Sequence, residues 1–482
     1  MTVDSGVRLP RSRPEIQGMG SSGIINFVNE MKLQQVELHS LMVLRHGQVV
    51  AEGWWAPYKA HFPHSLYSLS KSFTSAAIGL AVSEGRLSLD DKVISFFPDI
   101  LRDGELSPYL QQMTIRHLLT MSTGHDKETL NIDGRQQSNW IGTFFQAEVV
   151  FEPGTRFVYN SGATYMLSVI LQTVCGITLY EYLQPRLFKP LGFTGARWEL
   201  CPDGYNTGGW GLSLTTEDIA KFGQLYLQRG IWQDSRLIPE SWIDLSTSKQ
   251  IESEEEENSH WGQGYGYQFW RCKDDAYRAD GAFGQFCIVM PEEDAVVVTT
   301  CATQQTHLVL DAVWTHLRGA MGEEPVQEEA GTYERLKDTL QKLELTPPRY
   351  LFDSTLERRV TGLIYALEGG ELPWSRIGFS FGEQTAELGL YLDSGDMETI
   401  RFGRGVWIRN LIALPGQEQQ PAMASFTWEQ EHSLLLTLRF AETPLCVTVN
   451  IEFADEGITM RQSNNLSSAE EVIVQKGKRE NE

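Results

Sequence analysis

Hydrophobic residues follow two different spacings in the first part of the chain. Residues 36–55 contain two apolar runs on either side of His46–Gly47, which predicts a β-hairpin. From Leu69 onward apolar residues recur at helical spacing, and Gly85 is placed to end that helix. Small residues inside this helix let neighbours approach closely, so we expect it to be central and buried. Residues 87–230 are expected to be mainly helical.

Strand patterns return before residue 321. A helix is expected to begin after Thr215, whose hydroxyl can cap it while Asp218 lies in the first turn. Beyond it we interpret three runs as strands and a fourth as a closing helix: residues 264–270, 286–290, 295–300 and 307–321. Strands at both ends with helices between them predict an α+β domain whose two ends share one antiparallel sheet.

The pattern changes after residue 321. Residues 322–348 are charged and end in two prolines, which is typical of a linker with one helix. Short alternating runs with turn residues between them follow, and roughly eight to ten such strands predict a small barrel or sandwich. We therefore predict an α+β domain over residues 1–321, the linker, and an all-β domain over residues 349–482.

Length, charge and cysteine usage narrow the class of protein. A chain of 482 residues exceeds what one hydrophobic core usually fills, which agrees with two domains. The net charge of −23 argues against nucleic acid or an anionic membrane as a partner. The N-terminus lacks a signal-peptide pattern and no run reaches bilayer length, so we expect a cytoplasmic protein. Six scattered cysteines without a CxxC pair favour reduced thiols over disulfides or zinc.

The clearest chemical signal is Ser68-x-x-Lys71 at the start of the apolar helix. A first-turn serine has a free backbone N–H and lies at the positive end of the helix dipole, and Lys71 falls one turn later on the same face. Serine needs a proton acceptor to act as a nucleophile, and an amine serves only when burial or nearby cations keep it partly neutral. The alternative is a capping serine followed by an exposed lysine.

Two other serine motifs have the wrong context. Ser246 and Lys249 repeat the Ser-x-x-Lys spacing, but a charged stretch follows them and no apolar helix begins there. Residues 378–382 match GxSxG, yet the nucleophile elbow requires a strand, a turn and a helix, and another strand pattern follows Ser380. We interpret Ser380 as a strand residue.

Two further stretches strengthen the case for Ser68. Tyr159 lies in a loop just before another apolar helix, where its hydroxyl can be aimed rather than packed. Residues 281–284, Gly-Ala-Phe-Gly, lie at the edge of a strand, where backbone N–H groups can face a substrate. Over residues 25–320 the order Ser68-Leu-Ser-Lys71, "PGTRFVYNSG" and "DGAFGQ" resembles the serine β-lactamase and penicillin-binding-protein superfamily, in particular its class C-like carboxylesterases, D-aminopeptidases and amide hydrolases.

The resemblance implies a fold and a set of roles. It implies a β-lactamase/transpeptidase-like domain, to which some relatives append a lipocalin-like β-barrel. Ser68 would be the nucleophile, Lys71 would accept or relay its proton, and Tyr159 would be general base and later general acid. The backbone N–H groups of Ser68 and Ala282 would form the oxyanion hole, with Gly281 beside them.

Two departures from the family pattern bear on the substrate. The second motif is Tyr159-Asn160-Ser161, so Ser161 replaces the side-chain amide that relatives use against an acyl-amide group. The third motif is Ala279-Asp280-Gly281, which lacks the cation that grips a β-lactam carboxylate. Arg278 is adjacent, but in an extended strand it should point to the opposite face. Efficient β-lactam hydrolysis is therefore disfavoured.

Other conspicuous residues are weaker candidates. Most aromatic residues are expected to pack in the core, and Trp210, flanked by glycines, is the best candidate for lining a cleft. The acidic run at residues 254–257 beside His260 is expected to be a solvated loop rather than a metal site.

The sequence thus predicts a serine hydrolase that needs no metal or cofactor and cleaves a small ester, amide or short peptide. The open alternatives are a D-aminopeptidase, a weak β-lactamase, or a catalytically silent protein that binds acyl compounds or peptides. The oligomeric state stays open, with a homo-oligomer as one option.

Overall fold

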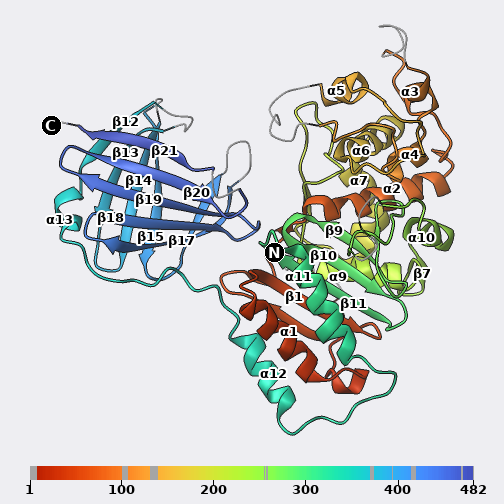
Figure 1. Ribbon diagram of the computed structural model, residues 1–482, viewed down its shortest axis with the longest axis horizontal. Coiled ribbons are helices and arrows are strands. Elements are labelled where there is room, and N and C mark those ends of the chain that lie inside the picture. The colour runs from red at the N-terminus through yellow and green to blue at the C-terminus, as the bar shows by residue number, and fades with distance from the viewer. Residues whose placement is uncertain are drawn as a thin grey trace. The chain divides into compact units, whose positions relative to one another are not determined.

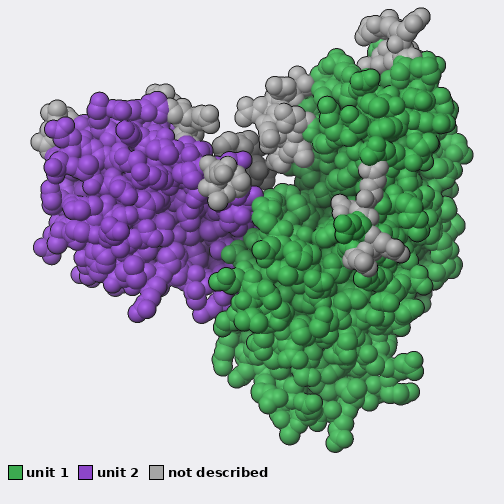
Figure 2. Space-filling view, viewed as in Figure 1, with its two compact units in different colours: residues 1–53, 60–342 green, residues 54–59, 343–482 purple. Residues whose placement is uncertain are grey.

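A computed structural model describes residues 8–99, 107–130, 139–253, 256, 259–369, 374–392, 395–413, 419–467 and 471–480. The chain divides into two compact units, which Figure 2 colours separately. The first comprises residues 1–53 and 60–342, and the second comprises residues 54–59 and 343–482. The short segment 54–59 joins the second unit because Ala56 pairs with Glu344 and the hydroxyl of Tyr58 donates to the carbonyl of Thr443 at 3.0 Å.

The first unit is built on a six-stranded antiparallel sheet in the order β2-β1-β11-β10-β9-β8 (Figure 1). Early and late strands pair directly, since Val43 of β1 lies opposite Val297 of β11. The prediction that both ends of this domain share one sheet is therefore confirmed. The strand bounds are β1 Leu38–Arg45, β2 Gln48–Trp54, β8 Trp270–Arg271, β9 Tyr277–Gly281, β10 Gln285–Met290 and β11 Ala295–Cys301.

The strand predicted over residues 264–270 is wrong. Only Trp270 belongs to a strand, because Gly264 and Gln268 adopt positive φ angles of 94° and 65° that an extended strand does not allow. The side-chain amide of Gln268 instead donates to the carbonyl of Leu119 at 2.9 Å. A tertiary contact thus overrides the local aromatic pattern.

Helix α2, Ser70–Ser83, is the central buried helix that the sequence predicts, and Gly85 follows its end with a φ of +69°. A Cβ at Gly79 would lie 2.3 Å from the Trp242 ring, so only glycine permits this close packing. Helix α6, Ser161–Cys175, packs against α2. Helix α9, Thr216–Leu227, is capped as predicted, with the Thr215 hydroxyl accepting from the Asp218 amide, and it packs on β1, β10 and β11.

The other helices of the first unit are α1 Ser21–Leu33, α3 Pro108–Gln112, α4 Ile115–Leu119, α5 Trp140–Gln146, α7 Leu179–Leu183, α8 Lys189–Leu191, α10 Glu240–Thr247, α11 Thr306–Ala312 and α12 Thr332–Gln341. A small sheet orders β3 His64–Ser65, β5 Leu212–Leu214 and β4 Arg197–Trp198, and β6 Ile231–Trp232 pairs with β7 Ser235–Arg236. Within the described ranges no single helix is long and apolar enough to cross a membrane, although α6 together with Leu179–Leu191, bent by 72°, has the length and composition.

The second unit is a closed barrel, which decides between the two predicted all-β folds. The described residues of this unit form ten strands, which lie in one sheet in the order β15-β14-β13-β12-β21-β20-β19-β18-β17-β16. A parallel pairing of Gly403 with Ser425 joins β15 to β17 and closes the ring, so β16 remains outside it. The bounds are β12 Ile364–Glu368, β13 Trp374–Phe381, β14 Thr385–Leu392, β15 Met397–Arg404, β16 Ile408–Ala413, β17 Gln419–Gln430, β18 Ser433–Phe440, β19 Cys446–Ala454, β20 Gly457–Asn464 and β21 Ile473–Arg479.

The barrel interior is a packed core in which Phe379, Phe426, Trp428 and Phe453 are buried. Helix α13, Leu356–Val360, packs against this core, and the first barrel strand, β12, begins after it at Ile364. As expected, Ser380 is a residue of strand β13.

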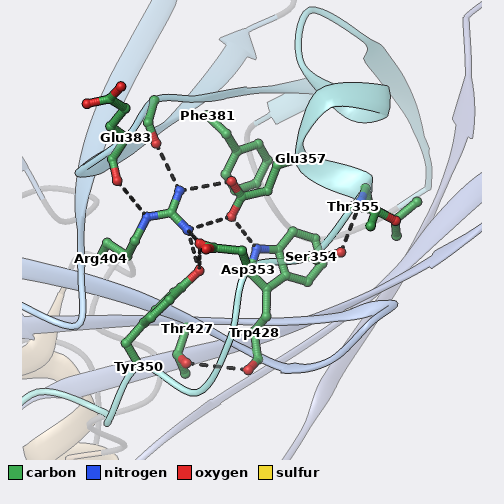
Figure 3. Close-up of polar contacts among 12 residues, drawn as sticks. Tyr350, Asp353, Ser354, Thr355, Glu357, Phe381, Glu383, Arg404, Thr427 and Trp428 are labelled. Atoms are coloured by element: carbon green, nitrogen blue, oxygen red, sulfur yellow. Dashed lines mark hydrogen bonds and ion pairs between the residues drawn. The ribbon is translucent and has the colours of Figure 1, made fainter.

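Arg404 ties helix α13 to the end of β15 (Figure 3). Its guanidinium donates to both carboxylate oxygens of Glu357, at 2.8 and 2.9 Å, and to the carbonyls of Gly382 and Glu383. The Glu357 carboxylate also accepts from the indole N–H of Trp428 at 2.8 Å. A largely buried charge pair is thereby fully hydrogen-bonded at one end of the barrel.

Candidate active site

Ser68 lies in a single 3₁₀ turn, Tyr67–Leu69, that leads directly into α2. Tyr67 adopts a positive φ of 49°, which is uncommon outside glycine. The hydroxyl of Ser70 donates to the Tyr67 carbonyl at 2.6 Å and holds the turn in this conformation. A Cβ at Gly281 would lie 2.2 Å from the Leu66 carbonyl, so the glycine allows the end of β9 to approach the turn. Gly281 therefore allows the close contact between β9 and the turn of Ser68, and it offers no side chain to the site.

Lys71 is fully enclosed, with 1% of its surface exposed. Its Nζ lies 3.1 Å from Ser68 Oγ, 3.1 Å from Ser161 Oγ and 2.7 Å from the Gly209 carbonyl. Burial lowers the pKa of Lys71 to about 7, although the charges of Glu128 and Asp280 oppose this shift. The amine is therefore partly neutral near neutral pH and can accept a proton from Ser68.

Tyr159 completes the group. The Lys71 Nζ lies 5.0 Å from the centroid of its ring, and the ring stacks on Trp270 with centroids 5.9 Å apart. A hydrogen bond with Ser68 favours the phenolate, but burial is the larger effect and raises the pKa of Tyr159 well above its usual range. The phenol is thus a proton donor at rest while Lys71 is the available acceptor.

The backbone amides of Ser68 and Ala282 are the two groups expected to form the oxyanion hole. Ser68 and Ala282 both lie at the start of a 3₁₀ turn, where N–H groups have no partner within the turn. The turn Ala282–Gly284 contacts the turn of Ser68, and the rings of Tyr67 and Phe283 meet edge to face at 5.2 Å. Ala282 is exposed.

Ser161 lies at the first turn of α6 and presents its hydroxyl to Lys71. Its backbone N–H donates to Glu128 Oε2 at 2.6 Å, and the N–H of Gly162 donates to Glu128 Oε1 at 3.1 Å. Glu128 therefore caps α6 and places a negative charge near Lys71. Sequence reasoning missed Glu128, because it precedes the helix that it caps by 33 residues and no motif marks it.

Asp280 and Arg278 form a buried pair at the end of β9. Arg278 Nε donates to Asp280 Oδ2 at 2.8 Å, and Trp261 Nε1 donates to the same oxygen at 3.2 Å. Alternate residues of a strand share a face, so Arg278 lies on the same side of β9 as Asp280 and opposite Ala279, the first residue of the third motif, in agreement with the expected alternation. Burial raises the pKa of Asp280 while Arg278 and Trp261 oppose the shift. The arginine charge is thus engaged by Asp280.

Trp210 is adjacent to the site but does not line an open cleft. Its side chain is buried, 7% exposed, with its ring 5.6 Å from that of Trp140. The preceding residue, Gly209, supplies the carbonyl that binds Lys71, and this backbone contribution was not foreseen. Three of the four residues in the acidic run 254–257 lie outside the described residues, and His260 binds Asp311 at 2.8 Å. Among the described residues no group of three or more His, Cys, Asp or Glu side chains could hold a metal ion.

Comparison with known proteins identifies the family. The family model described as Beta-lactamase matches residues 27–319. The chain belongs to the beta-lactamase family. This family membership confirms the resemblance on which Ser68, Lys71 and Tyr159 were selected.

Individual relatives are distant. The 6-aminohexanoate-dimer hydrolase of Paenarthrobacter ureafaciens is 24% identical over 288 residues, which cover 56% of this chain and 74% of that protein. Lovastatin esterase of Penicillium rubens is 27% identical over 154 residues, 27% of this chain and 38% of that protein. The octameric penicillin-binding protein homologue from Pyrococcus abyssi has a TM-score of 0.51 at 18% identity and covers 94% of this chain and 99% of its own, so it shares the fold.

Proposed function

We propose that the protein is a serine hydrolase that cleaves an ester or amide bond through an acyl-enzyme on Ser68. The observation that carries the proposal is the enclosed Lys71 amine, 3.1 Å from Ser68 Oγ and with a pKa of about 7. A pKa this far below the usual lysine value keeps the amine partly neutral near neutral pH, which is the condition for removing the serine proton. A capping serine with an exposed lysine would not have this burial.

The reaction begins with transfer of the Ser68 proton to neutral Lys71 as Oγ attacks the carbonyl carbon. The backbone N–H groups of Ser68 and Ala282 stabilise the oxyanion. As the intermediate collapses, the phenol of Tyr159 protonates the departing alcohol or amine and regains a proton from the Lys71 ammonium. Water then attacks the acyl-enzyme, gives its proton to the same pair of groups, and Ser68 recovers its hydrogen as the acid leaves.

The substrate class follows from the third motif. No cation is free at Ala279–Gly281 to bind a carboxylate, because Arg278 is held by Asp280. We therefore rank short acyl esters first, small amides or D-amino-acid peptides second and β-lactams third. The names of two relatives, a 6-aminohexanoate-dimer hydrolase and a lovastatin esterase, support an amide or ester substrate.

A fluorophosphonate probe with intact-mass analysis tests the nucleophile. We expect one label on the wild type and none on Ser68→Ala, and unchanged labelling of Ser68→Ala would contradict the assignment. A hydrolysis screen of acyl esters, D-amino-acid amides and nitrocefin, run on both proteins, then ranks the substrates.

A second candidate is a catalytically silent protein of the same fold that binds acyl compounds or peptides. It is motivated by Ser161 and Asp280, which replace the usual residues of the second and third motifs. Absence of fluorophosphonate labelling together with retained affinity for acyl compounds would favour this candidate.

A further inference from the structure

A chain of three side chains runs from the surface to the strand that precedes the nucleophile. Glu37 Oε1 lies 2.9 Å from His39 Nε2, and His39 Nδ1 lies 2.9 Å from His64 Nε2. His64 Nδ1 lies 2.9 Å from the carbonyl oxygen of Ser65, three residues before Ser68. The His39 side chain is fully buried, His64 is 4% exposed and the Glu37 side chain is 26% exposed, so the chain has one end at solvent.

The three contacts together require one extra proton. A carbonyl oxygen only accepts, so His64 Nδ1 carries a hydrogen. If His64 is neutral, its Nε2 is bare and His39 Nδ1 must donate to it. His39 Nε2 then faces a carboxylate oxygen, and that contact also needs a hydrogen. The complete chain therefore contains one more proton than two neutral histidines and an ionised Glu37 would hold.

The extra proton belongs on His39. Burial and the neighbouring His39 lower the pKa of His64 to about 3, so His64 stays neutral. A partly exposed carboxylate is more acidic than an imidazole, which places the proton on His39 as an imidazolium paired with Glu37. The buried charge is compensated by that pairing, as a charge inside a protein must be.

We infer that Glu37, His39 and His64 form a proton-dependent tether that positions the turn carrying Ser68. His39 belongs to β1 of the main sheet, whereas His64 belongs to β3, so the contact between the two rings fixes the start of the nucleophile segment to the sheet. Loss of the proton at rising pH leaves two bare nitrogens facing each other, or one facing the carboxylate, and breaks one link. These three are positioning residues, since Ser65 separates them from the reacting atoms.

Other titratable groups lie on the described strands next to this tether. Leu38 of β1 pairs with Cys301 of β11, and burial raises the pKa of the Cys301 thiol well above its usual range, so it stays neutral. In β4 and β5, which share the small sheet with β3, the charged residue is Arg197, and it is exposed. The partly exposed Glu37 side chain gives the proton a route to solvent.

Imidazole ¹⁵N NMR of the full-length protein tests the proton count without depending on the reaction. We expect His39 protonated on both ring nitrogens and His64 on Nδ1 alone at pH 7. In Glu37→Gln, the neutral amide removes the compensating charge, and His39 should lose one proton. A neutral His39 in the wild type at pH 7 would overturn the inference.

The rate of Ser68 labelling by a fluorophosphonate, followed against pH, tests the positioning role. Glu37→Gln should label about tenfold more slowly, since a displaced nucleophile reacts poorly. The alkaline limb of its profile, where the labelling rate falls as the tether loses its proton, should move to lower pH. Glu37→Asp should restore most of the rate, and Glu30→Gln, which removes a carboxylate on α1, should match the wild type. A Glu37→Gln rate within twofold of the wild type with an unmoved alkaline limb would refute the role. No labelling of the wild type would instead count against the proposed hydrolase, and the NMR result would still stand.

Discussion

The Lys71 amine lies closer to the carbonyl oxygen of Gly209, at 2.7 Å, than to Ser68 Oγ, at 3.1 Å. A carbonyl only accepts, so one amine hydrogen is always directed to Gly209. In the neutral amine the second hydrogen can go to Ser161 Oγ, 3.1 Å away, which leaves the lone pair for the Ser68 hydroxyl. The two acceptors therefore orient Lys71 as a base before any substrate arrives.

The first prediction concerns the acid side of the pH profile. Because burial lowers the pKa of Lys71 to about 7, the amine is protonated below that pH and neutral above it. The rate of Ser68 labelling should rise about tenfold per pH unit below pH 7 and level off above it. Stopped-time labelling between pH 5 and 8 with mass detection measures this. A flat profile over that range would show that Lys71 is not the acceptor.

A related prediction concerns Glu128. Its negative charge raises the pKa of Lys71 against the larger effect of burial, so Glu128→Gln should move the acid limb to lower pH. The glutamine oxygen can still accept from the Ser161 amide, so the cap of α6 is largely kept. The neighbouring exposed acid provides a control, and Asp126→Asn should leave the limb in place. A Glu128→Gln limb at the wild-type position would refute the electrostatic coupling.

The parts of the site that the sequence predicted are those set by local geometry. Ser68 and Lys71 lie one helical turn apart, so their contact follows from spacing once the helix is recognised. Tyr159 required the family resemblance, since 88 residues separate it from Lys71. Glu128 and the Gly209 carbonyl could not be found, because both depend on tertiary contacts made by loop residues without a motif.

The fold shows the same difference between features set by local sequence and features set by tertiary contacts. The hairpin at His46–Gly47 and the helix that ends before Gly85 were predicted from alternation, helical spacing and glycine placement. The strand predicted over residues 264–270 failed because the positive φ of Gln268 is stabilised by distant backbone partners. Local sequence patterns do not reveal such distant partners. The boundaries of helices and strands are therefore predicted incorrectly where these contacts form.

A third prediction addresses substrate charge. Asp280→Asn removes the negative charge beside Lys71 and frees Arg278 from its ion pair. The kcat/KM of esters with a carboxylate on the acyl group should rise about tenfold relative to the kcat/KM of neutral esters. This factor corresponds to about 1.4 kcal/mol of transition-state stabilisation. Asp275→Asn, which removes an exposed acid bound to Arg271, should leave the ratio unchanged. An unchanged ratio for Asp280→Asn would mean that Asp280 does not select against carboxylates.

The last prediction concerns Arg404 in the barrel. Its planar guanidinium binds both oxygens of Glu357 and two backbone carbonyls, and the lysine ammonium cannot reproduce that fork. Arg404→Lys should therefore leave part of the mostly buried Glu357 carboxylate without a partner and reduce the free energy of unfolding by about 3 kcal/mol. The unfolding transition in urea can be followed by far-UV circular dichroism. Arg376→Lys provides the control, because its ion pair with Glu480 is 3.8 Å long and exposed, and it should change the free energy by less than about 0.5 kcal/mol. Equal midpoints for the two variants would show that the Arg404 network does not hold α13 on the barrel.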